Sequence, residues 1–420
     1  MIFAAFALKL ATSVQRGERY VHDRRSYRVR TTVFREKTIA MKTERKASCP
    51  CGSGKEWTAC CAGAALNRML EEHNRRQIHI QKFGHGTPIV TTEYDGERVI
   101  NVGPQLIKYR GLKTFHDFLI ASARDDLFGR EWINSELSKQ TAEQHPVAQW
   151  YGAVLEFQKQ HYDKEKELSE AVATGPVRAY LRLAYDLYLL AHHRLLQKKM
   201  IKRLKNLRQF QGARYETYVA AAFVKAGFEV VLEDETDTAT SHCEFNARHK
   251  ATGARYSIEA KSRHRAGFLG YPGTPKPLTE IKAEVTNLLR KAFLKRANYE
   301  RIIFIDINVP FEAAGSIYET GWFERIATQM PELDKRKPGN NPWPPAFVFF
   351  TNHPEHYLPR DVPDPGHSVL FTVINIPGFK EPSTPEFKPP PTSPLSHYPA
   401  VQQLLDSVGK HTGIPSDFDS

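Results

Sequence analysis

Apolar and polar positions follow two periods in the segment from residue 209 to residue 308. Apolar residues recur at helical spacing up to Gly227, and alternating or continuous apolar runs mark the strands that follow. The predicted elements are a helix at 210–227, a strand at 228–233, a hairpin at 242–263 turning near Thr252 and Gly253, a helix at 277–298 and a buried strand at 301–309. This α-β-β-β-α-β order predicts an α/β fold in which helices flank a mixed sheet.

The rest of the chain gives a largely helical region before this segment and extra strands after it. The predicted elements before it are a helix at 62–82, a hairpin at 86–103 with Asp95-Gly96 as its turn, and mostly helical structure at 114–172. A longer helix is expected from Pro176 to about Leu207, and its basic end, QKKMIKRLKNLR, is interpreted as a solvated charged face rather than a phosphate-contacting helix. The predicted elements after it are strands at 345–352 and 367–376 and a short helix at 400–408.

These patterns divide a multi-domain α+β chain into five parts. The parts are a disordered basic leader at 1–46, a cysteine motif at 47–63, a mostly helical region with one hairpin at 64–208, an α/β domain at 209–380, and a proline-rich linker with a short C-terminal helix at 381–420.

Composition fits a soluble globular protein, with 41% hydrophobic and 11% aromatic residues among 420. No apolar run approaches the roughly 20 residues that a membrane-spanning helix needs. The opening MIFAAFALKLA lacks the small-residue cleavage site of a signal peptide. We therefore expect a cytoplasmic protein that does not contact a membrane.

The net charge of +12 is concentrated at the N-terminus. Residues 1–46 contain 12 Lys and Arg against 4 Asp and Glu, so they carry +8 and leave +4 for the rest of the chain. This leader is interpreted as a transit peptide, a nucleic-acid-binding arm, or sequence ahead of a start at Met41, and these alternatives stay open. The basic pI is therefore weak evidence that the folded body binds nucleic acid.

Four of the five cysteines lie in the stretch SCPCGSGKEWTACC: Cys49, Cys51, Cys60 and Cys61. Four thiolates complete a tetrahedral Zn²⁺ site without an open position, which is typical of a structural site. Gly52, Ser53 and Gly54 allow the tight turn that brings the two pairs together. A disulfide between the adjacent Cys60 and Cys61 would close a strained ring. The pattern therefore predicts structural zinc.

This stretch closely resembles the SEC-C motif over residues 48–63. That small zinc fold occurs at the tail of the bacterial preprotein translocase ATPase and as an appendage on many unrelated proteins. The resemblance implies a module that docks the chain onto a partner protein or nucleic acid, rather than a catalyst.

The predicted hairpin contains a second candidate site. In YSIEAK, Glu259 and Lys261 share one strand face, and in HCEFNA the alternation points Glu244 away from the core. Pairing of the two strands can bring Glu244 beside Glu259 and Lys261. Two carboxylates this close repel each other unless a cation lies between them, and oxygen ligands suit Mg²⁺ or Mn²⁺.

Glu216 in the preceding helix is a further candidate. It lies three residues before Val219 and seven before Phe223, on the face expected to pack against the sheet. A carboxylate on that face costs several kcal/mol unless it is paired or coordinated.

These features are similar to the PD-(D/E)xK nuclease superfamily, the restriction-endonuclease-like fold, over about residues 209–308. The resemblance implies that Glu244 and Glu259 hold Mg²⁺ or Mn²⁺ with the backbone carbonyl of Ala260. Lys261 would orient the attacking water and stabilise charge on the phosphate, and Glu216 would tune the metal or its waters. The metal would activate water to hydrolyse a phosphodiester.

The chain departs from this superfamily at Glu244, where Asp is usual, and at Cys243, where Pro is frequent. The longer side chain shifts the carboxylate by about one methylene, so Asp234 and Asp237 compete with Glu244 for its role.

The sequence therefore predicts metal-dependent cleavage of nucleic acid, with DNA as the expected substrate. Arg263, His264 and Arg265 follow the E-x-K strand and would contact the phosphate backbone. One alternative is a catalytically inactive zinc-binding adaptor. Another is an enzyme of a different class that uses His353 and His356, which follow the strand at 345–352.

Overall fold

The computed structural model describes residues 5–6, 49, 51–56, 60–161, 165, 168, 170–232, 243–314, 316–337, 341–376 and 394–418. The chain divides into a small unit, Ser13–Ile78, and a large unit made of Met1–Thr12 and His79–Ser420. The predicted leader, apart from Ala5–Phe6, and most of the proline-rich linker lie outside the described residues. The predicted helix after the cysteines is confirmed as α1, Cys61–Phe83.

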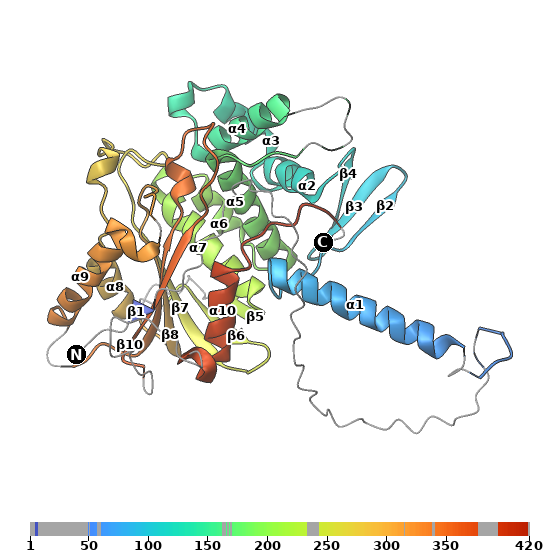
Figure 1. Ribbon diagram of the computed structural model, residues 1–420. Helices are drawn as coiled ribbons and strands as arrows, with labels where there is room; N and C mark the ends of the chain where they lie inside the picture. The colour runs from blue at the N-terminus through green and yellow to red at the C-terminus, as the bar shows by residue number, and fades with distance from the viewer. Residues whose placement is uncertain are drawn as a thin grey trace, which may run out of the picture. The chain divides into compact units, whose positions relative to one another are not determined.

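A mixed sheet lies within the large unit, with the strand order β1-β10-β9-β8-β7-β6-β5 (Figure 1). Its strands are β1 (Ala5–Phe6), β5 (Phe228–Leu232), β6 (Phe245–His249), β7 (Arg255–Ser262), β8 (Glu300–Asp306), β9 (Ala346–Asn352) and β10 (Ser368–Ile374). Strand β8 pairs in parallel with β7 and β9, and the other pairs are antiparallel. The predicted hairpin is confirmed as β6 and β7, and both predicted C-terminal strands are present.

Both faces of this sheet are covered, as the side chains of β8 show. Ile302 and Phe304 belong to a core cluster that includes residues of α5 (Gly175–His192), α7 (Leu207–Lys225) and α10 (Pro399–Gly409). Ile303 and Ile305 belong to a second cluster with residues of α8 (Thr286–Phe293) and α9 (Gly321–Lys335). An uninterrupted apolar run is what a strand buried on both faces requires. The fold is thus mixed, with helices on either side of the sheet.

The predicted helical region is confirmed in outline. It contains α2 (Phe115–Ser122), a π-helical turn at Ala123–Leu127, α3 (Arg130–Leu137), α4 (Pro146–His161), α5, α6 (Lys198–Leu204) and α7. The prediction of one helix from Pro176 to Leu207 is wrong, because the chain leaves the helix after His192 and restarts at Lys198. Arg194 takes a left-handed φ of 59°, and the backbone N–H groups of Leu195 and Leu196 both donate to the carbonyl of Leu190. These bonds end α5 and redirect the chain.

The prediction of a helix at 277–298 is also too long. Only Thr286–Phe293 form α8, while a 3₁₀ turn at Leu278–Glu280 and irregular chain precede it. The side chain of Gln329, from α9, accepts a hydrogen bond from the Val285 N–H at 2.8 Å and donates one to the Ala283 carbonyl at 2.6 Å. A buried amide from a distant helix thus bonds the backbone where α8 begins.

A separate three-stranded sheet has the order β2-β3-β4, with β2 at Thr91–Tyr94, β3 at Glu97–Val102 and β4 at Gln105–Arg110. The predicted hairpin with Asp95-Gly96 in its turn is confirmed. Both turn residues have positive φ, 52° and 70°, as a tight two-residue turn of this kind demands.

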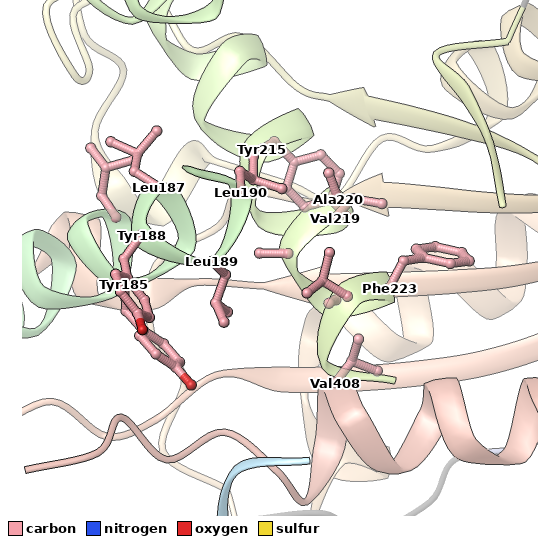
Figure 2. Packing of buried hydrophobic residues seen from close by; sticks show 14 of the residues in the cluster. Tyr185, Leu187, Tyr188, Leu189, Leu190, Tyr215, Val219, Ala220, Phe223 and Val408 are labelled. Carbon is pink, nitrogen blue, oxygen red and sulfur yellow. The ribbon is translucent and has the colours of Figure 1, made fainter. Parts of the chain in front are cut away.

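Helices α5 and α7 share one core, although the predicted domain boundary runs between them. Figure 2 shows Leu187 and Leu190 of α5 among the buried side chains that include Val219 and Phe223 of α7 and Val408 of α10. The boundary at residue 208 stays a prediction.

Helix α5 is also tied to the sheet by charge. The Arg182 guanidinium donates at 2.9 Å to Glu355, in the 3₁₀ turn Pro354–Tyr357 after β9, and contacts Asp364 at 3.5 Å. The Glu355 side chain is only 1% exposed. The buried charge of Glu355 is therefore neutralised by an arginine that lies about 170 residues earlier in the chain.

Helix α4 gives a testable dependence of stability on pH. His145 is buried just before Pro146, its Nδ1 accepts the Val147 N–H at 3.2 Å, and burial lowers its pKa to about 4. The unfolded chain binds a proton at His145 near pH 6.5, whereas the folded chain does so only near pH 4. The contribution of neutral His145 to the free energy of unfolding is therefore fully present above pH 6.5 and is lost as the pH falls towards 4.

We expect His145→Asn, which keeps an acceptor but does not titrate, to lose about 3 kcal/mol less stability than the wild type between pH 7 and pH 4. Urea unfolding at both pH values measures this difference. Equal losses in the two proteins would contradict it.

Candidate functional site

The four cysteines form a compact cluster in the small unit. Their sulfur atoms all lie within 4.8 Å of one another, with Cys51 and Cys60 3.5 Å apart and Cys60 and Cys61 3.9 Å apart. A tetrahedron with metal–sulfur bonds of about 2.3 Å has edges of about 3.8 Å. All four thiols are free. The cluster is therefore placed to hold a metal ion, consistent with zinc.

The backbone around the cysteines explains how four sulfurs converge. The Cys49 N–H donates to the Lys55 carbonyl at 2.8 Å, which closes the loop between them. Gly52 and Gly54 have φ of 77° and 69°, a conformation that strains other residues. The Ser53 hydroxyl lies 3.1 Å from the Cys60 sulfur. Hydrogen bonds from Ser53 and from the neighbouring cysteines lower the pKa of the Cys51 thiol to about 6. Cys61 is the first residue of α1.

Glu244, Glu259 and Lys261 are brought together at the junction of β6 and β7. Glu244 lies directly before β6, and its N–H donates at 2.9 Å to the carbonyl of Ile258, the β7 residue that also pairs with Phe245. The Lys261 ammonium lies 3.3 Å from Glu244 Oε1 and in closer contact with Glu259 Oε1. Those two oxygens are therefore separated by less than twice 3.3 Å. The cation that the two carboxylates share in the structure is the Lys261 ammonium.

Burial makes Glu259 an unusual member of this group. The residue is 1% exposed, and its Oε2 has no hydrogen-bond partner among the described residues. Burial raises the pKa of Glu259 to about 7, against the opposing effect of Lys261. Although burial disfavours the charged form of Lys261, the two carboxylates outweigh it and raise the pKa of that ammonium. A buried carboxylate with a bare oxygen gains from a cation that coordinates it.

Glu216 of α7 belongs to the same neighbourhood. It lines a small cavity of about 40 Å³ together with Glu244 and apolar residues from the α5–α6 connection. Burial raises the pKa of Glu216, with a further contribution from Glu244, while Arg203 and Lys261 oppose it. Arg203, from α6, donates to both Glu216 oxygens, at 2.5 and 2.7 Å. Glu216, Glu244, Glu259, Lys261 and Arg203 are called the carboxylate cluster below.

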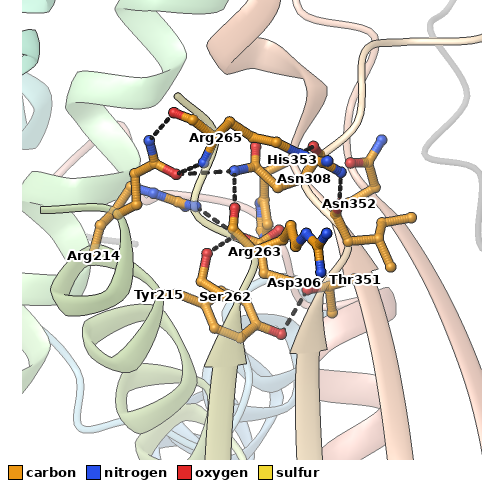
Figure 3. Close-up of polar contacts among 12 residues, drawn as sticks. Arg214, Tyr215, Ser262, Arg263, Arg265, Asp306, Asn308, Thr351, Asn352 and His353 are labelled. Carbon is orange, nitrogen blue, oxygen red and sulfur yellow. Dashed lines mark hydrogen bonds and ion pairs between the residues drawn. The ribbon is translucent and has the colours of Figure 1, made fainter. Parts of the chain in front are cut away.

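A polar network fixes the loop that follows β7 (Figure 3). Asp306, at the end of β8, accepts from Arg214 and from Ser262, each at 2.9 Å. The guanidinium of Arg265 donates to the backbone carbonyls of residues 282, 307 and 308 at 2.9–3.0 Å. Arg265 therefore supports the loop, whereas the sequence placed it among the phosphate contacts. Arg214 and Asp306 were not singled out in the sequence, because isolated charges in helix and strand patterns carry no signal of pairing.

A cavity of about 600 Å³ opens beyond this loop. Its lining includes His264 and the charged residues Arg263, Arg265, Lys276, Glu280, Lys282 and Glu284. His264 links it to the carboxylate cluster: a Cβ added to Gly212 would lie 3.2 Å from His264 Nε2 and 3.9 Å from Glu216 Oε1. Glycine at position 212 thus leaves room for the imidazole beside Glu216.

The remaining candidates lie elsewhere or outside the described residues. His353 and His356 line a buried cavity of about 20 Å³ with Arg182, Arg214 and Glu355, and burial lowers the pKa of His356. Glu259 does not line this cavity. Asp234 and Asp237, the competitors of Glu244, fall in the segment at 233–242 that is not described.

Comparison with known proteins gives no match to a family model, to a curated protein or to a solved structure. The helices that the structure describes include none long and apolar enough to cross a membrane. The geometry of the two sites is therefore the basis for a functional proposal.

Proposed function

We propose that the chain is a nuclease of the PD-(D/E)xK type, which hydrolyses phosphodiester bonds in nucleic acid, with DNA as the expected substrate, using Mg²⁺ or Mn²⁺ at Glu244 and Glu259. The observation that carries the proposal is the single ammonium of Lys261 between two carboxylates, Glu259 on β7 and Glu244 directly before β6. The order α7-β5-β6-β7-α8-β8 supports it, because it follows the element order of that superfamily.

The ligand count fits such an ion. Among the described residues, only the four cysteines form a group of three or more ligand side chains within 4.8 Å, so the carboxylate cluster offers a pair rather than a cage. Mg²⁺ is commonly held by one or two carboxylates, with waters and substrate phosphate completing its shell. When bound, the ion would supply an activated water and neutralise charge on the phosphate.

The chain's own residues then have separate roles. Glu244 and Glu259 would hold the ion, and Lys261 would orient the water and donate to a phosphate oxygen. Water oxygen forms a bond to phosphorus and gives up a proton to solvent, while the bond from phosphorus to the sugar oxygen breaks and that oxygen takes up a proton from solvent. Arg263, Lys276 and Lys282, which line the large cavity, contact phosphates along the strand and position it without reading base sequence.

The zinc-bound cysteines would serve as the SEC-C-type docking module of this enzyme, recruiting it to a partner protein or to nucleic acid. The exposed residues at 51–56 support a role in contact with a partner. An inactive zinc-binding adaptor is the alternative, and the bare, buried oxygen of Glu259 weighs against it.

A cleavage assay tests the proposal. Wild-type protein is expected to cut plasmid or single-stranded DNA with Mn²⁺, and EDTA is expected to stop the reaction. Lys261→Ala should reduce the rate by at least about a hundredfold, because an ammonium aimed at developing charge contributes roughly 3 kcal/mol. Lys250→Ala, in the β6–β7 turn on the same hairpin, is the matched control. No cleavage by wild type on either DNA, or full activity in Lys261→Ala, would contradict the nuclease.

A further inference from the structure

Arg203 is the cation in the carboxylate cluster that comes from outside the predicted catalytic core. It lies near the end of α6, in the basic run that the sequence indicated as solvent-facing. Its two terminal nitrogens each bond a different oxygen of Glu216, so both carboxylate oxygens are engaged. The Arg203 side chain is 22% exposed and the Glu216 side chain 15%. Such a two-point contact fixes the carboxylate in one orientation.

The break between α5 and α6 makes this contact possible. A continuous helix through residues 193–197 would advance along one axis, whereas the chain turns at Arg194 and starts a new helix at Lys198. Helix α6 then packs on α7, and Arg203 reaches Glu216, which lies 13 residues later. The helical region thus contributes a charge to a cluster built otherwise by α7, β7 and the residue before β6.

The charges of the cluster are unequal in number. Glu216, Glu244 and Glu259 provide three carboxylates, and Arg203 and Lys261 provide two cations. Arg203 acts electrostatically on Glu244 as well as on Glu216. With Glu216 neutralised by Arg203, Glu244 and Glu259 share the one ammonium of Lys261 and keep one net negative charge, which attracts a divalent ion to this pair.

We propose that Arg203 is a positioning residue that acts as a fixed cation: it holds Glu216 and takes the place that a second divalent ion would otherwise fill. This inference rests on the proposed metal-dependent hydrolysis. It assigns a role to the helical region, whose arginine would limit the cluster to a single, moderately bound ion and keep Glu216 oriented towards the reaction.

Removing the arginine should therefore have opposite effects on metal binding and on rate. A unit positive charge several ångströms away repels a divalent cation and so weakens its binding. Arg203→Ala is expected to bind Mn²⁺ at least about tenfold more tightly than wild type. Its cleavage rate at saturating Mn²⁺ is expected to fall at least about tenfold, since Glu216 loses its orientation.

The test uses the full-length chain with one equivalent of Zn²⁺ bound at the cysteines. Mn²⁺ binding is titrated by electron paramagnetic resonance, and single-turnover cleavage is measured on the same samples. Arg203→Lys keeps the charge without the two-point contact, so it should retain wild-type Mn²⁺ affinity and lose rate. Arg248→Ala is the matched control. It removes an arginine that donates through two nitrogens to one oxygen of Glu229, an exposed glutamate on the same sheet, and it should change neither quantity.

The outcomes separate the two proposals. If wild type binds no Mn²⁺ beyond what Glu259→Ala binds, the nuclease site and the role of Arg203 both fail. If wild type binds Mn²⁺ through Glu259 and Arg203→Ala binds it equally or more weakly, only the role of Arg203 fails. Tighter binding with slower cleavage supports it. If Arg203→Ala does not fold, Arg203→Lys decides, because wild-type rate in that variant overturns the positioning role.

Discussion

Replacing Glu259 by glutamine is expected to reduce Mn²⁺-dependent cleavage by at least about a thousandfold while leaving the fold at least as stable as wild type. A metal ion supplies several kcal/mol of charge stabilisation, and about 4 kcal/mol corresponds to a thousandfold in rate. Glutamine cannot replace the anionic ligand. The substitution does, however, remove a buried carboxyl group whose pKa is already raised to about 7 by burial.

The stability of Glu259→Gln relative to wild type is expected to increase with pH. Because the folded chain holds a proton on Glu259 more strongly than the unfolded chain, ionising the group costs stability as pH rises from 4.5 to about 7. Glu259→Gln should therefore gain on wild type over that range and keep its advantage above it. Thermal unfolding at pH 5 and pH 8 measures the difference. Glu229→Gln, which replaces an exposed glutamate on β5, is the control for the cleavage rate.

Lower stability of Glu259→Gln at pH 8 would mean that the Lys261 contact, not the burial, dominates. Unchanged cleavage would remove Glu259 from the metal site.

Serine at Cys61 is expected to lower zinc content from one ion per chain to less than about a tenth of that after dialysis against a weak chelator, because structural zinc sites depend on all four thiolates. Cys61 also begins α1, so the loss should expose the preceding loop to proteolysis. Elemental analysis and limited trypsin digestion measure the two effects.

Cys243→Ser is the matched control for that experiment, since Cys243 is buried directly before β6 and is not a member of the four-cysteine cluster. It should keep one zinc per chain. Full zinc retention by Cys61→Ser would show that three cysteines suffice and that the fourth position is open.

The sequence was most informative where local patterns decide structure. The alternation in YSIEAK placed Glu259 and Lys261 on one strand face, and Glu244, directly before β6, contacts Lys261 as the hairpin prediction required. The spacing of the four cysteines was likewise sufficient to predict their convergence. In both cases the residues that come together belong to one short stretch of sequence or to one hairpin.

The sequence was least informative where distant residues decide. Nothing in HHRLLQKK contains the glycine or proline that usually ends a helix, yet α5 stops there, and Arg203 therefore could not be placed beside Glu216. The start of α8 depends on Gln329, more than 40 residues later. Arg265 was predicted to face phosphate, but its partners are three backbone carbonyls whose positions follow only from the folded loop.

The contact of Arg182 with Glu355 has a consequence for any attempt to isolate the proposed catalytic half. A protein trimmed to start at residue 209 would keep the buried carboxylate of Glu355 but lack the Arg182 guanidinium that pairs with it. The free energy of unfolding would fall by an amount on the order of 3–5 kcal/mol. We expect such a fragment to aggregate rather than cut DNA. Over evolution, the segment with the E-x-K strand would have to be inherited together with its helical neighbour, not exchanged between proteins as a free-standing cassette.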